Sequence, residues 1–226
     1  MSAAKTEDTT TPRFTLIFGN FELVIAILLG LVSIATAYAS FQAALYDSQM
    51  AGAYTIGNAQ ATEAESLYLE GNQQFLQDTQ VFNQLSLLQV DIANGDALAQ
   101  EKYDTLYFQG VSDEFGAAID RAAALTEADP DFFYSPLDDE DYQDFLFSEY
   151  SSTKADSVAT IAKGDDYNSR SDKLTLYTVL LSISLFLLGI AALVRQRRTQ
   201  YVLVGTGFVI SVVAVILTAT IPFVGL

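Results

Sequence analysis

Apolar residues gather in three long runs along the chain, namely Leu23–Leu45, Leu174–Val194 and Tyr201–Ile221. A helix needs about 20 apolar residues to cross the hydrocarbon core of a bilayer, and each run supplies that number. The third run is the clearest, because no charged residue lies between Tyr201 and Leu226. The pattern therefore predicts an integral membrane protein with transmembrane helices at residues 19–45, 174–194 and 201–222.

Between the first two runs, apolar and small residues recur at steps of mostly three, four or seven, which is typical of one packed stripe of a helix. No proline occurs between Leu23 and Ile92, so we expect the first span to continue as one long helix. A break at Gly52, Gly57 or Gly71 stays open, because glycine weakens a helix. The stripe consists of Tyr46, Met50, Ala53, Gly57, Ala64, Tyr68, Gly71, Phe75, Phe82, Leu85 and Ile92.

The turn signal Asn94-Gly95-Asp96 ends this helix, and a second helix is expected over residues 97–125. Ser135 and Pro136, followed by acids, form a helix-start signal for a third helix that continues into the second apolar run. The predicted fold is all-α: three transmembrane helices, two of them extended into an antiparallel extramembrane helical hairpin, with the shorter second helix packed against it. The expected buried side of that second helix comprises Tyr107, Phe108, Val111, Phe115 and Ile119.

Charge is distributed unevenly along the chain. The whole sequence has a formal net charge of −17, yet residues 46–173 alone carry 25 Asp and Glu against six Lys and Arg, a net charge of −19. Such an acidic segment repels phosphates, so nucleic acid is not an expected partner. In molar salt the Debye length is only about 3 Å and dense like charge costs little, so we expect a halophilic source.

Cationic residues mark one expected side of the membrane. The positive-inside rule places residues 1–18 and the link 195–200 in the cytoplasm, and residues 46–173 and 223–226 outside it. The expected location is therefore the plasma membrane, with several passes through the bilayer. The cationic residues on the cytoplasmic side are Lys5, Arg13, Arg195, Arg197 and Arg198.

The first apolar run has a second interpretation. Ala35-Thr36-Ala37 and Ala37-Tyr38-Ala39 resemble the small-x-small sites at which signal peptides are cleaved. The preceding region is long and carries acids, and the helical pattern continues past Ala39, which favours a retained span. Cleavage of the first span stays open.

Two residue types that many enzymes use are missing. The sequence has no Cys and no His, which removes thiolate nucleophiles, the usual proton-transfer side chain near neutral pH and the commonest metal ligand. No enzymatic activity and no cofactor are therefore expected, and the enzymatic alternative that stays open is an activity that uses carboxylates alone. Four consecutive acids are weak candidates for a divalent cation, but their place at a helix start explains them without a metal. These acids are Asp138, Asp139, Glu140 and Asp141.

Small residues in the first span form a predicted helix-packing face. Ala35, Ala39 and Ala43 follow each other at steps of four, and Gly30 follows Ala26 at the same step. Such stripes let membrane helices approach closely, either within one chain or between chains. No charged group lies near the centre of this span, and three larger polar side chains lie near its ends, where we expect them to anchor it at the interface. These residues are Glu22, Tyr38 and Gln42.

Several stretches of the chain carry a family resemblance: Ala35–Ala43, Asp78–Phe82, Gly95-Asp96, Asp172–Leu181 and Leu185–Ile190. Together they resemble an uncharacterised prokaryotic family of small three-span membrane proteins, with a long helical hairpin between spans one and two. The family usually has Trp where Tyr38 stands, and its middle segment is less acidic. The resemblance implies a layout of helices and carries no functional residues.

These observations lead to two functional hypotheses. The first is a non-enzymatic, membrane-anchored helical assembly or sensing module, which acts through oligomerisation or a membrane-protein partner. The alternative is an oligomeric ion channel or transport accessory subunit, whose acidic outer segment would attract cations. The lipid bilayer is a partner in both.

Overall fold

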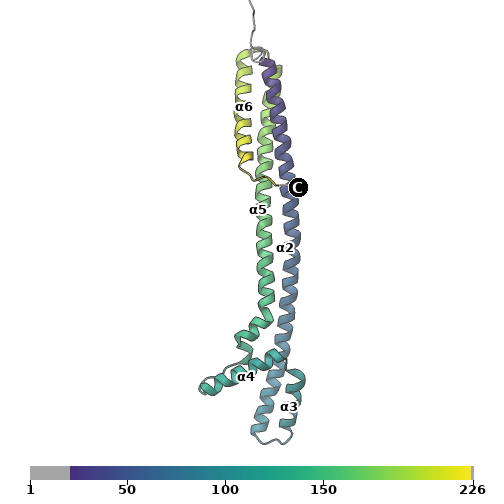
Figure 1. Ribbon diagram of the computed structural model, residues 1–226, viewed down its shortest axis with the longest axis vertical. Helices are drawn as coiled ribbons and strands as arrows, with labels where there is room; N and C mark the ends of the chain where they lie inside the picture. Colours follow the sequence, from purple (N-terminus) through teal and green to yellow (C-terminus); the bar gives the residue numbers. More distant parts are fainter. Residues whose placement is uncertain (1–20, 225–226) are drawn as a thin grey trace, which may run out of the picture. The chain divides into compact units, whose positions relative to one another are not determined.

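The computed structural model describes residues 21–224, and the regular structure in that range is entirely helical (Figure 1). The all-α part of the prediction is confirmed. Three of the helices are long and apolar enough to cross a membrane, which suggests a multi-pass membrane protein. The elements are α2 (Phe21–Ala93), α3 (Ala99–Gly110), α4 (Asp113–Ala128), the 3₁₀ turn η1 (Pro136–Asp138), α5 (Glu140–Leu193) and α6 (Arg197–Ala219).

The chain packs as two units, and α2 and α5 each contribute to both. We call residues 21–52 and 163–224 the apolar unit, and residues 53–162 the acidic unit. The apolar unit has five acidic and six basic residues, whereas the acidic unit has 21 acidic and three basic residues. The acidic unit therefore has a net charge of −18, whereas the apolar unit is close to neutral.

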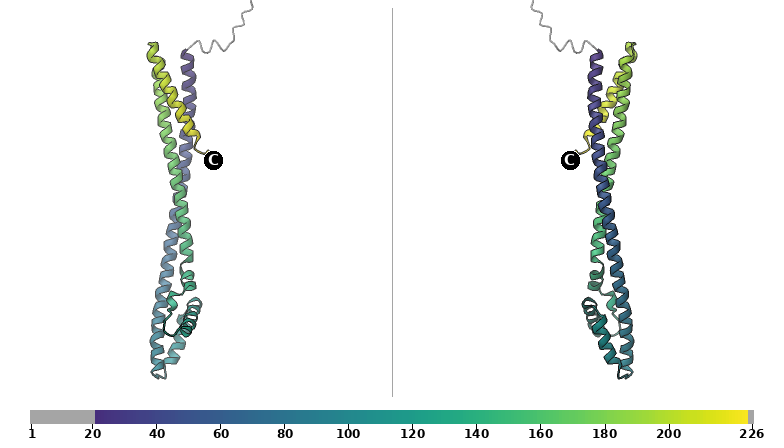
Figure 2. Two further views of the ribbon diagram at one scale, coloured as in Figure 1. Left: turned by 90° about the vertical axis from the view of Figure 1, so that its left-hand side faces the viewer. Right: turned by 90° about the vertical axis from the view of Figure 1, so that its right-hand side faces the viewer.

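In the apolar unit, segments of α2, α5 and α6 pack around a shared core (Figures 1 and 2). α6 runs back along α5 and crosses toward α2. Small residues allow close approach: a Cβ atom on Gly207 would lie only 3.3 Å from the carbonyl oxygen of Ser184. The Ser184 hydroxyl in turn donates a hydrogen bond of 2.6 Å to the Gly207 carbonyl. The buried core residues are Val32, Ala39, Leu181, Leu188 and Ala214.

In the acidic unit, α2 and α5 run antiparallel, and α4 packs against both through its aromatic residue Phe115. The Ser157 hydroxyl donates a hydrogen bond of 2.8 Å to the Gly57 carbonyl, and a Cβ atom on Gly71 would lie 2.5 Å from the Leu146 carbonyl oxygen. These glycines are therefore points of close helix approach. α2 continues through them without a break, which confirms the prediction of one long helix from the first apolar run.

The prediction of one helix over residues 97–125 is wrong. α3 ends at Gly110, and α4 begins after Ser112, whose hydroxyl caps the new helix by accepting a hydrogen bond of 3.3 Å from the Phe115 amide. Ser is a preferred N-cap residue, so the signal was present in the sequence. The break changes the direction of the chain, and Phe108, which was expected to be buried, is 88% exposed.

The predicted third helix also begins differently. Ser135 accepts a hydrogen bond from the Leu137 amide and Pro136 follows it, as the sequence signal indicates. The structure that they start is only the short turn η1, however, and the long helix α5 begins two residues after it, at Glu140. The cap of α5 is Asp139, whose carboxylate accepts a hydrogen bond of 3.0 Å from the Tyr142 amide.

Candidate functional site

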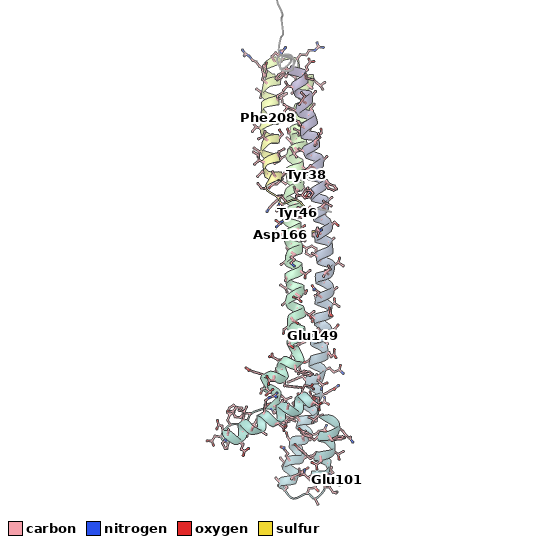
Figure 3. The ribbon with its side chains drawn as sticks, viewed as in Figure 1. Tyr38, Tyr46, Glu101, Glu149, Asp166 and Phe208 are labelled. Atoms are coloured by element: carbon pink, nitrogen blue, oxygen red, sulfur yellow. The ribbon has the colours of Figure 1, made fainter. Side chains whose placement is uncertain are left out.

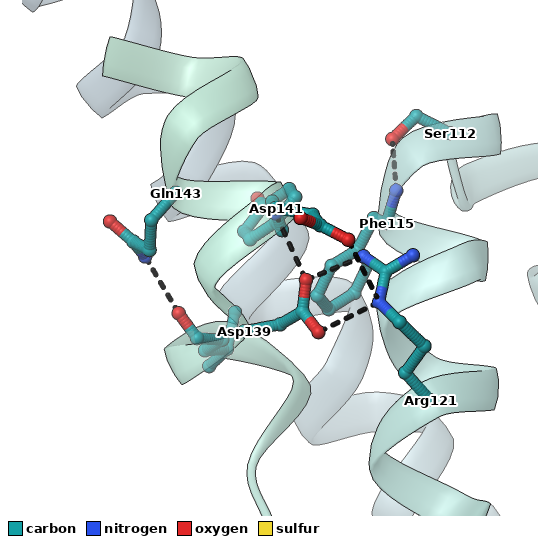
Figure 4. Close-up of polar contacts among 8 residues, drawn as sticks. Ser112, Phe115, Arg121, Asp139, Asp141 and Gln143 are labelled. Carbon is teal, nitrogen blue, oxygen red and sulfur yellow. Dashed lines mark hydrogen bonds and ion pairs between the residues drawn. The ribbon is translucent and has the colours of Figure 1, made fainter. Parts of the chain in front are cut away.

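The acidic run at the start of α5 is centred on an ion pair (Figure 4). The Asp139 carboxylate accepts hydrogen bonds from the Arg121 guanidinium of α4, one of them 2.9 Å long from Nε. These hydrogen bonds lower the pKa of Asp139 below its usual value, against the opposing effect of partial burial. Asp141 lies farther away, with its carboxylate 3.7 Å from Arg121 Nε. Asp139 therefore joins α4 to α5.

The other acids of the run point to solvent. Asp138, Glu140 and Asp141 are exposed, while Asp139 is engaged by Arg121. In residues 21–224, no three carboxylates are grouped in a way that could hold a metal ion. A helix cap and an ion pair account for Asp139 here, and these are structural roles.

A second polar cluster lies inside the acidic unit. Asp78 of α2 is only 1% exposed, and its carboxylate accepts a hydrogen bond of 2.6 Å from the hydroxyl of Tyr142 of α5. The Gln74 side-chain amide donates to both carboxylate oxygens, at 3.0 and 3.1 Å. Burial, followed by Asp78 itself, raises the pKa of Tyr142 above its usual value, so this hydroxyl stays protonated. Sequence reasoning missed this cluster, although Asp78 falls between two members of the apolar stripe, Phe75 and Phe82.

The small residues of the first span do not all have the same surroundings. Ala39 is fully buried and Ala43 is 6% exposed, and both pack inside the apolar unit. Ala35 is partly buried beside the same core. Gly30 is exposed, with no neighbouring atom within 4 Å of an added Cβ. The alanines therefore contribute to packing within the chain, and Gly30 does not.

The segment after α6 folds against α2 through a specific set of hydrogen bonds. The Gln42 side-chain amide donates to the Val224 carbonyl at 3.3 Å, and its oxygen accepts from the Val224 amide at 3.0 Å. The Tyr46 hydroxyl donates a hydrogen bond of 2.7 Å to the Pro222 carbonyl. Gln42 is thus 2% exposed and holds a backbone segment, whereas Tyr38 is 45% exposed.

Tyr46 also contacts α5 in the apolar unit (Figure 3). The Arg170 guanidinium lies 5.7 Å from the centroid of the Tyr46 ring and donates to its hydroxyl at 3.4 Å. Arg170 also pairs with Asp166, one turn earlier on α5, at 2.7 Å. These contacts are a further link between α2, α5 and the segment after α6.

The acidic unit presents one uncharged exposed line of residues on α2, which we call the amide–leucine stripe. Its members follow each other at alternating steps of four and three, and all of them are exposed. Leu69 is 64% exposed, Leu76 52%, Leu87 67% and Val90 58%. The stripe consists of Leu69, Gln73, Leu76, Gln80, Asn83, Leu87 and Val90.

Alternating steps of four and three are the spacing of a coiled-coil seam, in which two helices meet along one line. This stripe is hard to recognise in the sequence, because the packed stripe of the same helix gives the stronger apolar signal. It was nonetheless present in the sequence as Leu and amide residues at heptad spacing.

No protein-family model, no curated protein and no solved structure matches the chain. The resemblance to a prokaryotic membrane-protein family therefore stays a prediction.

Proposed function

We propose that this protein is a non-enzymatic, membrane-anchored helical module, which assembles with a second copy of itself along the amide–leucine stripe. The observation that carries the proposal is that stripe: seven exposed residues at heptad spacing, none of them charged, on a unit with 21 acidic and three basic residues. Exposed leucines in a heptad line are stabilised when a second helix covers them.

The charge of the acidic unit favours the stripe over its other surfaces as the place where two copies meet. Two acidic units repel each other wherever their carboxylates face one another. The stripe is a line along which two copies meet without placing like charges face to face. Because the stripe contains Gln73, Gln80 and Asn83, its association is expected to be weak but specific in register, since polar seam residues lower stability and select one alignment.

The membrane would fix the direction of this assembly. In the proposed arrangement, the apolar stretches of α2, α5 and α6 span the plasma membrane, with the Arg-containing link in the cytoplasm and the acidic unit outside. α2 and α5 would then form the two antiparallel legs of one hairpin. Two copies inserted in the same way have parallel α2 helices, which brings Leu76 of one copy beside Leu76 of the other.

Cysteine cross-linking tests the proposal cleanly, because the sequence has no Cys. We expect Leu76→Cys and Asn83→Cys to give a disulfide-linked dimer in native membranes under mild oxidation, since facing seam positions come within disulfide distance. The matched control is Gln77→Cys, which is exposed and about 100° around the helix from Leu76. Dimer of equal yield from the control, or none from the two seam variants, contradicts the proposal.

A second experiment measures the mass of the full chain in detergent. We expect Leu76→Glu to weaken self-association by about tenfold or more, because it places like charges opposite each other in the seam. Leu98→Glu is the matched control, since Leu98 is also a 59% exposed leucine of the acidic unit but lies outside the stripe. If both variants keep the mass of the parent protein, or both lose it equally, the stripe is not the interface.

A further inference from the structure

A crevice of about 500 Å³ lies in the apolar unit where the link between α5 and α6 meets the start of α2. Its lining is mostly polar, and two of its side chains, Arg195 and Arg197, are cationic. Among the described residues that line it, Glu22 is the one carboxylate. The crevice therefore presents two positive charges against one negative charge.

Both guanidinium groups of the crevice are available to a ligand. Within residues 21–224, the ion pairs involve Arg121, Lys154 and Arg170, and neither Arg195 nor Arg197 takes part in one. Residues 21–224 contain 26 acidic residues, yet none of their carboxylates forms an ion pair with either guanidinium. Glu22 lines the same crevice without coming within 4.0 Å of either guanidinium.

The start of α6 adds to the positive potential of the crevice, and two side-chain contacts order its walls. α6 begins at Arg197, and its N-cap Gln196 makes no side-chain capping hydrogen bond, so the first amides of this 23-residue helix lack a partner from the cap. Phe21 of the lining stacks edge-on against Tyr201, with ring centroids 4.8 Å apart. Gln200 is 8% exposed and fixes the start of α6 by donating to the Ala191 carbonyl at 3.1 Å.

We propose that this crevice binds a phosphate group, carried either by the head group of an anionic lipid or by free phosphate. A guanidinium matches two phosphate oxygens at once, and two such groups on one crevice match a phosphate better than separate surface charges do. The crevice lies at the ends of apolar helices, where lipid phosphates are found, and basic pockets between membrane helices are typical sites for anionic head groups. This site is separate from the amide–leucine stripe and does not depend on assembly.

The test uses the purified full chain in detergent, with native mass spectrometry to count bound lipids. The probes are phosphatidylglycerol and phosphatidylcholine with the same acyl chains, and inorganic phosphate without lipid. We expect Arg195→Gln and Arg197→Gln each to weaken phosphatidylglycerol binding by about tenfold, because each removes one charge-assisted contact. Arg198→Gln is the matched control, since it removes the same charge from the neighbouring position outside the crevice lining; its effect should stay below about twofold.

A gain of binding keeps the test independent of folding defects. Glu22→Gln removes the one carboxylate of the crevice, so we expect it to strengthen binding by about twofold to fivefold. If inorganic phosphate binds and the variants rank in the same order of affinity, while phosphatidylglycerol does not bind, free phosphate is the ligand. If all three arginine variants lose phosphatidylglycerol affinity equally, the effect comes from overall charge and the proposal is overturned. Equal binding of the two lipids, in the absence of any bound inorganic phosphate, overturns it as well.

Discussion

The hydroxyl of Tyr142 on α5 lies 2.6 Å from the carboxylate of Asp78 on α2, and both side chains are about 1% exposed. A carboxylate buried this deeply is costly unless its oxygens accept hydrogen bonds. Asp78 receives them from Tyr142 and from Gln74, and within the described chain it has no cationic partner. The pair therefore makes the contact between α2 and α5 specific in a way that apolar packing alone does not.

Tyr142→Phe should destabilise the acidic unit at neutral pH by about 1–3 kcal/mol, because it leaves a buried acceptor without its best donor. The measurement is the denaturation midpoint of the full chain in detergent, followed by circular dichroism. Tyr134→Phe, at a partly exposed tyrosine of the same unit, is the control and should change the midpoint little. A neutral effect of Tyr142→Phe means that Asp78 is satisfied in another way.

The same hydroxyl predicts a dependence of stability on alkaline pH. Burial and then Asp78 raise the pKa of Tyr142 in the folded state above its usual value of 10.0. Above that pH the unfolded chain loses the proton while the folded chain keeps it, so stability falls as pH rises, by up to about 1.4 kcal/mol per pH unit. Tyr142→Phe should therefore lose less stability than the parent protein between about pH 10 and 12. If the free energy of unfolding falls equally with pH in the two proteins, this assignment to Tyr142 is contradicted.

Asp139 predicts the opposite dependence, at acid pH. Its pKa is lowered, chiefly by the hydrogen bonds from Arg121, so its contribution is present above the unfolded pKa of about 3.9 and is lost as pH falls through the folded value. Asp139→Asn should reduce stability at neutral pH and make it less sensitive to acid below about pH 4. Asp138→Asn, at the exposed neighbour, is the control, and an identical acid response in both variants argues against the ion pair.

The sequence predicted the helices well wherever one pattern dominated. Three apolar runs and an uninterrupted helical stripe were enough for α2, α5 and α6, because length and periodicity depend on local residue choice. The break between α3 and α4 was missed because residues 97–125 continue one helical pattern, and Ser112 acts as a cap only where the chain turns to place Phe115 in the core.

The sites were less predictable, because they depend on which residues of different helices meet. The acids from Asp138 to Asp141 form one group in the sequence, yet only Asp139 lies where Arg121 reaches it with two nitrogens. Asp78 and Tyr142 are 64 residues apart, so nothing local indicates their contact. Gln42 was expected at a membrane interface, and its bonds to Val224 depend on where α6 ends.

Gly71 and Gly52 should respond in opposite ways to a methyl group. A Cβ atom on Gly71 would meet the backbone oxygen of Leu146 at 2.5 Å, so Gly71→Ala should cost about 1–3 kcal/mol by forcing α2 and α5 apart. Gly52 has no atom within 4 Å of its Cβ position, so Gly52→Ala should stabilise the helix by up to about 1 kcal/mol. Thermal unfolding of the two variants tests this, and equal shifts contradict the close approach at Gly71.

The excess of acids predicts a dependence of stability on salt. The acidic unit has 21 acidic and three basic residues, and the Debye length falls from about 10 Å in 0.1 M salt to about 3 Å in 1 M salt. The unfolding temperature of the full chain should therefore rise with sodium chloride over this range. Sucrose at matched osmolality serves as an uncharged control. An unfolding temperature that does not change with salt contradicts the expectation of a halophilic source.

Asn83 should set the register of the proposed assembly. It is the one asparagine of the amide–leucine stripe, and an asparagine in a coiled-coil seam selects one alignment and number of helices at a cost in stability. Asn83→Leu should tighten self-association by about tenfold or more and allow species larger than the dimer. Sedimentation equilibrium of the full chain in detergent measures both effects. Gln77→Leu adds a leucine outside the stripe and should leave them unchanged, so an equal response from the two variants would show that added apolar surface, rather than the seam, drives association.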